Sequence, residues 1–165
     1  MWMKKIFILF FLSLSFFFSL TFSLTYAQSK VDFDFKTIDG KVYKLSNFNG
    51  KVVLVNLFAS YCAPCMLELK VLQKLHEACS VKGLQVVSLM VDLDGAPLLP
   101  RIVKSRNLTY PVGLANKAVF EIFKDFSTTP TTYIFDQKGN LAKKVVGYQS
   151  FEDWKMTLSN LVKCN

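Results

Sequence analysis

The pattern of apolar and polar positions predicts a chain in which strands and helices alternate. Residues 51–58 (KVVLVNLF) and 84–91 (LQVVSLMV) are short, almost continuous apolar runs, which is typical of strands buried on both faces. Between them, residues 62–79 change to the three-to-four-residue spacing of an amphipathic helix. A strand, a helix and a second strand in this order favour a parallel pair with a crossover helix.

Weaker patterns flank this centre. Val31, Phe33 and Phe35 alternate with polar residues, and the Asp39-Gly40 turn signal precedes a returning strand over residues 42–45, so we expect an N-terminal hairpin. Downstream, the pattern predicts a loop over residues 92–100, helices over 98–106 and 116–125, strands over 131–135 and 141–146, and a last helix that opens at Ser150. The sequence therefore predicts one mixed α/β domain, parallel at first and then antiparallel.

The N-terminus carries a different pattern. Between Ile6 and Leu24, 14 of 19 residues are apolar, Lys4 and Lys5 precede this run, and Ala27 follows it as a small residue. A charged start, an apolar run and a small-residue exit predict an export signal over residues 1–27 and a domain over residues 28–165. Nineteen apolar-rich residues are also long enough to cross a bilayer, so a retained membrane anchor stays open.

Composition and charge exclude some classes of protein function. The chain is 52% apolar, but no second long apolar run exists, which excludes a polytopic membrane protein. The formal net charge is +8, and the basic residues are scattered, with no block longer than Lys143-Lys144. The simplest interpretation is that these basic side chains are exposed to solvent. The alternative is a basic patch that binds an acidic partner or a membrane surface. We expect no nucleic-acid partner and a monomer.

The sequence Cys62-Ala63-Pro64-Cys65 is the central chemical feature. It follows a buried strand and opens a helix, whose free N–H groups would lower the pKa of the Cys62 thiol and make it a nucleophile. Cys65 lies one turn further on, where it can close a disulfide. A zinc site needs about four ligands, and the chain offers His76 alone, about 16 Å along the helix, and no second CxxC. We therefore expect a redox pair, no metal and no cofactor.

These motifs carry a family resemblance. Residues 56–69 (NLFASYCAPCMLEL) resemble the TlpA/ResA/CcmG group of exported thioredoxin-like thiol–disulfide oxidoreductases, as do residues 45–54 and the segment 129–136 (TPTTYIFD). The resemblance implies a thioredoxin-like three-layer α/β sandwich with a mixed central sheet and an N-terminal β-hairpin extension. Two residues depart from the family pattern: Tyr61 replaces a Trp before the first cysteine, and Phe58 stands where a second Trp is common.

The resemblance also implies roles for further residues. Pro130 would follow a cis peptide and expose the Thr129 backbone to a substrate, with Tyr61 and Pro64 beside it. Glu68 matches the acid of the ResA-type site, and it lies within the apolar helix stripe next to Cys65, so we expect partial burial and a raised pKa. Such an acid can move a proton on or off Cys65. A solvated glutamate is the alternative.

The function predicted is a periplasmic reductant of disulfides in exported proteins. The resemblance implies a membrane thiol transporter as electron donor and apocytochrome c as a substrate. One alternative is a thiol peroxidase of the related redoxin superfamily, which needs a Thr three residues before its reactive cysteine, where this chain has Ala59. The other is a metallochaperone or partner-binding module.

Two cysteines remain, Cys79 at the end of the predicted active-site helix and Cys164 at the end of the predicted last helix. In a thioredoxin-like fold both helices pack on one face of the sheet and run away from the active-site edge. An even number of cysteines in an exported chain favours pairing. We therefore expect a structural Cys79–Cys164 disulfide, with two unpaired thiols as the alternative.

Overall fold

A mixed five-stranded sheet forms the centre of the computed structural model, which describes residues 30–164. Its strand order is β5-β4-β3-β6-β7, with β3, β4 and β5 parallel and β6 and β7 antiparallel to their neighbours. The strands are β3 (Val52–Phe58), β4 (Leu84–Met90), β5 (Val112–Leu114), β6 (Thr131–Phe135) and β7 (Leu141–Val146).

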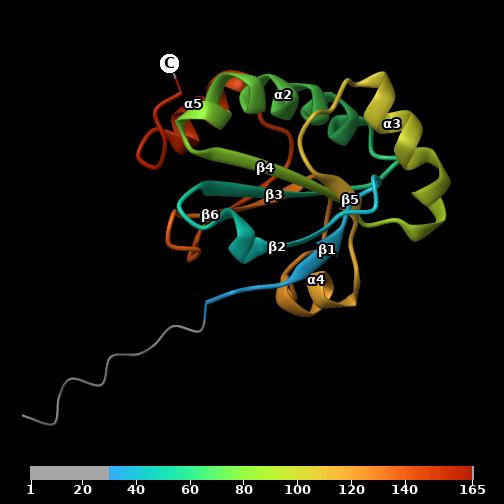
Figure 1. Ribbon diagram of the computed structural model, residues 1–165. Coiled ribbons are helices and arrows are strands. Elements are labelled where there is room, and N and C mark those ends of the chain that lie inside the picture. The colour runs from blue at the N-terminus through green and yellow to red at the C-terminus, as the bar shows by residue number, and fades with distance from the viewer. Residues whose placement is uncertain (1–29, 165) are drawn as a thin grey trace, which may run out of the picture.

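Helices cover both faces of this sheet, as Figure 1 shows. One face carries α2 (Ala63–Cys79), α3 (Leu99–Ser105) and α5 (Phe151–Leu158). The other carries α4 (Lys117–Ile122) and the hairpin of β1 (Asp34–Lys36) and β2 (Val42–Lys44). Short 3₁₀ turns lie at η1 (Leu45–Phe48), η2 (Ser80–Lys82) and η3 (Leu93–Leu98). This is the three-layer sandwich with an N-terminal hairpin that the family resemblance implied.

The two central strands are buried along their whole length, which explains their continuous apolar sequences. Successive side chains of a strand point to opposite faces. In β3, Val52, Leu54 and Phe58 therefore join the core under α2, whereas Val53 and Val55 join the core under the hairpin. The sheet is thus packed on both sides, and its carboxyl edge is where the connection to α2 begins.

Three details of the sequence prediction were wrong. The short strand β5 was missed, because three residues are too few to show a period. The expected loop over residues 92–100 contains the 3₁₀ turn η3, whereas α3 begins at Leu99 within the helix predicted over residues 98–106, with Pro100 in its first turn, where it loses no helical hydrogen bond. The last helix does not reach Cys164: α5 ends at Leu158, where Ser159 and Asn160 follow, and these residue types favour caps and turns over helix interiors.

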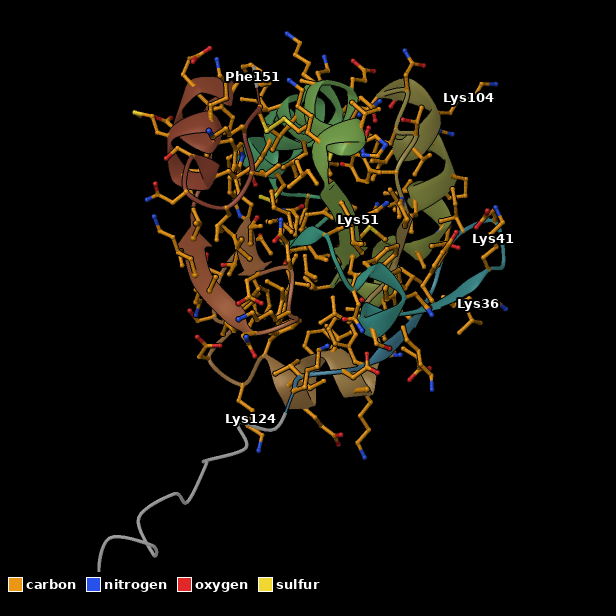
Figure 2. The ribbon with its side chains drawn as sticks, turned by 60° about the vertical axis from the view of Figure 1, so that its left-hand side comes forward. Lys36, Lys41, Lys51, Lys104, Lys124 and Phe151 are labelled. Atoms are coloured by element: carbon orange, nitrogen blue, oxygen red, sulfur yellow. A yellow bond between two sulfur atoms is a disulfide. The ribbon has the colours of Figure 1, made fainter. Side chains whose placement is uncertain are left out.

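Basic side chains are spread around the molecule. In Figure 2, the labelled Lys36 and Lys41 extend outward from the hairpin, Lys104 from α3 and Lys124 from the segment after α4. Within residues 30–164, no helix is long and apolar enough to cross a membrane. The predicted signal or anchor over residues 1–27 lies outside the described residues.

Candidate active site

The Cys62–Cys65 pair lies at the start of α2, just beyond the end of β3. The two residues form a disulfide, with their Cα atoms 5.2 Å apart. Cys62 is the N-cap of α2, and its sulfur accepts a hydrogen bond of 3.2 Å from the Cys65 backbone N–H. Cys62 keeps 8% of its surface exposed and Cys65 none. An incoming group therefore reaches Cys62 before Cys65.

An aspartate holds the turn that leads into this pair. Asp92 lies two residues beyond the end of β4, and its carboxylate accepts hydrogen bonds from the Ser60 backbone N–H at 2.8 Å and from the Ser60 hydroxyl at 2.5 Å. Gly95 packs against this contact so closely that a Cβ atom there would collide with both partners. These contacts fix the backbone just before Cys62. Asp92 was not predicted as a site residue, although a polar residue just beyond the carboxyl end of a buried parallel strand is a recognisable signal.

Glu68 is buried directly behind the disulfide. It follows Cys65 by three positions, so the two side chains are neighbours on the helix surface, and it is only 1% exposed. One carboxylate oxygen accepts the Gln149 backbone N–H at 3.0 Å, and the other accepts the Asn56 side-chain N–H at 3.1 Å. The solvated-glutamate alternative is therefore wrong.

Burial sets the protonation of this carboxyl group. It raises the pKa of Glu68 from an ordinary 4.5 to about 7, because a charged carboxylate loses its hydration in the core. The Gln149 N–H and the Asn56 amide both donate to the carboxylate and hold the pKa below what burial alone would give. Glu68 can therefore gain or lose a proton near neutral pH.

Two of the residues around Glu68 were not predicted as site residues. Asn56 is the one polar residue in the β3 run, which is a visible signal in hindsight. Gln149 acts through its backbone N–H, so its residue type carries no information about this contact.

The residues expected to contact a substrate lie at the same edge of the sheet. Tyr61 is 81% exposed beside Cys62, and Pro64 is exposed in the first turn of α2. Leu57 of β3 pairs with Thr131 of β6, so Pro130 comes next to the end of β3 that leads to the disulfide. The Thr129–Pro130 peptide is cis, with Thr129 half-buried and Pro130 buried.

The other two cysteines lie at the far end of the helix layer. Cys79 ends α2, and Cys164 lies six residues beyond the end of α5; the structure joins them in a disulfide with a Cα–Cα distance of 5.1 Å. His76 is half-buried nearby, with its ring against Tyr110. Among residues 30–164, no group of acidic, His and Cys side chains could hold a metal ion.

The chain is similar in sequence to a known family and to named relatives, and similar in structure to a solved protein. The sequence model of the AhpC/TSA family matches residues 27–144. The thioredoxin-like protein YneN of Bacillus subtilis is 31% identical over 135 residues, which cover 79% of this chain and 77% of YneN. The thiol–disulfide oxidoreductase ResA of Bacillus thuringiensis is 27% identical over 127 residues, 75% of this chain and 71% of ResA. A solved thiol:disulfide interchange protein of the thioredoxin family from Chlorobium tepidum superposes with a TM-score of 0.73 at 25% identity, over 79% of this chain and 92% of that one.

Proposed function

This chain belongs to the AhpC/TSA family and is a thiol–disulfide oxidoreductase with a thioredoxin-like fold, and we propose that it reduces disulfides of exported proteins through Cys62 and Cys65. The observation that carries this proposal is the arrangement at the start of α2: a sulfur at the helix N-cap, a second sulfur buried one turn away, and a buried acid beside the second.

The exchange runs in two steps. The Cys62 thiolate attacks one sulfur of a substrate disulfide, a mixed disulfide forms, and the first substrate thiolate leaves. Cys65 then loses its proton and attacks the Cys62 sulfur, so that the Cys62–Cys65 disulfide closes and the second substrate thiolate leaves. Two electrons pass to the substrate, and an external dithiol must reduce the pair again before the next cycle.

Glu68 supplies the proton transfer in the second step. Its carboxylate accepts the Cys65 proton, and in the recharging reaction its protonated form returns it. Because the pKa of Glu68 is about 7, both forms are populated near neutral pH, which suits a group that works in both directions.

The exposed ring of Tyr61, together with Pro64 and the Thr129–Pro130 segment, forms the contact surface for the substrate in this proposal. An extended substrate chain would pair with the Thr129 backbone. The export pattern of residues 1–27 and the resemblance to the TlpA/ResA/CcmG group support a periplasmic protein, either released or held by an N-terminal anchor. They also support a membrane thiol transporter as electron donor and apocytochrome c as a substrate.

The test is a trapping experiment with an oxidised peptide that contains a CxxCH motif. Cys65→Ser should accumulate a mixed disulfide with this peptide on Cys62, because the resolving sulfur is gone, whereas the reduced wild-type protein should release the reduced peptide. Failure of both reactions would contradict the proposal. Rapid consumption of peroxide without reaction with the peptide would favour the thiol peroxidase alternative.

The role of Glu68 is tested by Glu68→Gln in the same assay. The second step should be slower by about 10- to 100-fold above pH 7, and its rise with pH through the neutral range should disappear. An unchanged pH–rate profile would mean that Glu68 does not take the Cys65 proton.

A further inference from the structure

A row of polar side chains crosses the sheet beneath α2. The side chains of β3, β4 and β6 on this face are otherwise apolar. Asn56 of β3 pairs in register with Ser88 of β4 and Thr132 of β6, so the three stand side by side on the same face. Each is no more than 2% exposed. Buried polar groups are costly unless they are hydrogen-bonded, so the partners of this row decide what it does.

Asn56 is the centre of the row, and its amide is fully engaged. The NH₂ group donates to Glu68 at 3.1 Å and to the Thr132 hydroxyl at 3.0 Å, while the amide oxygen accepts from the Ser88 hydroxyl at 3.4 Å. The Ser88 hydroxyl also contacts the Tyr110 hydroxyl at 3.2 Å. A flipped amide would turn its oxygen towards the Glu68 carboxylate and lose both donated bonds, so the network fixes the donor towards Glu68.

Besides the Asn56 amide, few of the groups that face Glu68 can stabilise the negative charge of its carboxylate. The titratable groups beside it are Cys65 on its own helix and Tyr110 from the segment before β5, where burial raises the pKa of the phenol further above its ordinary value. The loop before α5 contributes the Gln149 N–H, whereas the indole N–H of Trp154 in α5 makes no hydrogen bond to a described residue. Within the described residues, no charged side chain acts on the pKa of Glu68.

The Asn56 amide is therefore well placed to act on the Glu68 carboxylate. We propose that Asn56 is a positioning residue that holds the Glu68 carboxylate in one orientation behind Cys65 and stabilises the ionised form that accepts the Cys65 proton. The inference rests on the proposed role of Glu68. Without the amide, burial would keep Glu68 protonated to a more alkaline pH, and the second step of the exchange would need that higher pH.

The test is a titration of Glu68 by carboxyl ¹³C NMR in the oxidised protein, in which the cysteines do not titrate. Glu68→Gln assigns the signal. Asn56→Leu, which removes the donor at similar size, should raise the pKa of Glu68 by about 1 to 2 pH units, since a hydrogen bond to a charged group is lost. Asn56→Asp keeps the shape and provides a second variant if the leucine chain does not fold. Its two carboxyl groups should share a proton and titrate in two separated steps.

The matched control is Gln85→Met. Gln85 is also a buried amide of a central strand, but it bonds only to the Val86 carbonyl oxygen among the described residues and does not contact Glu68. This variant should leave the Glu68 titration unchanged. The pH profile of the second exchange step should move to alkaline pH in the Asn56 variants and not in the control.

The outcomes separate this inference from the proposed function. In one outcome, Glu68→Gln abolishes the rise of the second-step rate through neutral pH, but the Asn56 variants leave the pKa of Glu68 unchanged. The inference about Asn56 is then wrong, and the role of Glu68 stands. If Glu68→Gln leaves the pH–rate profile unchanged, the role of Glu68 is wrong and the inference falls with it.

Discussion

The burial of Glu68 beside the Cys62–Cys65 pair makes its ionised form energetically unfavourable. The folded protein binds a proton on Glu68 up to about pH 7, whereas an ordinary glutamate releases it near pH 4.5. Between these values the folded state therefore holds a proton that the unfolded state has lost, and the free energy of unfolding must fall as the pH rises. The same burial that makes Glu68 useful as a proton carrier thus destabilises the fold above neutral pH.

This cost can be measured with Glu68→Gln in the oxidised protein. The wild-type protein should lose about 3 kcal/mol of Glu68-dependent stability between pH 4.5 and 7 and none above that. The difference between wild type and variant isolates this effect from the titration of other groups. Urea unfolding at several pH values checks it, and a difference that does not vary with pH would contradict a raised pKa.

The two cysteines of the pair should differ sharply in reactivity. In the reduced protein, iodoacetamide at pH 6 should modify Cys62 first, since Cys62 is the helix N-cap and Cys65 is fully buried. Cys62→Ser should abolish insulin reduction, whereas Cys65→Ser should still form mixed disulfides. Faster alkylation of Cys65 would reverse the assignment.

Among individual residues, the sequence best predicted those whose own side chains take part in the reaction. Cys62 and Cys65 could be found from their spacing at the start of one helix, and Glu68 from the resemblance to the ResA-type site. The contacts of Asp92 and Gln149 could not be predicted, because they join segments that are distant in the sequence: Ser60 with Asp92, and Glu68 with the Gln149 backbone.

Among the elements, α5 has a function beyond packing. Its first residues form a capping box, in which the Ser150 hydroxyl accepts the Asp153 N–H at 3.2 Å and the Asp153 carboxylate accepts the Ser150 N–H at 3.0 Å. These bonds also fix Gln149, the residue just before the cap, which donates to Glu68. The start of α5 therefore supports the active site from the opposite side to β3.

Ser150→Ala should lower the free energy of unfolding by about 1 kcal/mol, because the first turn of α5 loses its cap. The matched control is Ser159→Ala at the other end of α5, where the exposed hydroxyl bonds, among residues 30–164, only to the Met156 carbonyl oxygen and the loss should stay within about 0.5 kcal/mol. Urea denaturation of both variants measures this. Equal losses would contradict a specific role for the capping box.

Element prediction worked where a period is long enough to read. The buried strands β3 and β4 and the helix α2 were predicted within a residue or two, and the capping box located the start of α5. The strand β5 lies beside β4 because Ser88, Leu89 and Met90 offer it a free edge, and that reason is tertiary. The end of α5 was missed although Ser159 and Asn160, whose residue types favour caps and turns, follow its last residue.

Across the whole molecule, the two helices beside the active site are connected at both ends. Glu68 of α2 accepts a hydrogen bond from the segment before α5 at one end, and Cys79 is bonded to Cys164 at the other. The second connection closes a loop with a sequence separation of 85 residues. A crosslink of this span restricts the unfolded chain strongly, which favours the folded state.

Cys164→Ser should therefore lower the free energy of unfolding by about 4 kcal/mol under oxidising conditions. Under full reduction, wild type and variant should have nearly the same stability, because neither then has the crosslink. Thiol counting by mass spectrometry verifies the pairing in the wild-type protein. Equal stability of the two proteins in oxidising buffer would contradict a stabilising disulfide.

The central claim, that the molecule works as a reductant, is tested most directly by the reduction potential of the Cys62–Cys65 pair. The pair can be equilibrated with thiol–disulfide buffers, alkylated, and quantified by mass spectrometry of the peptide that contains both cysteines. Ala63 and Pro64 place no basic side chain between the cysteines, and Cys62 accepts one backbone hydrogen bond. We therefore predict a potential nearer to that of thioredoxin, about −270 mV, and a value near that of a strong oxidant, about −120 mV, would contradict the account.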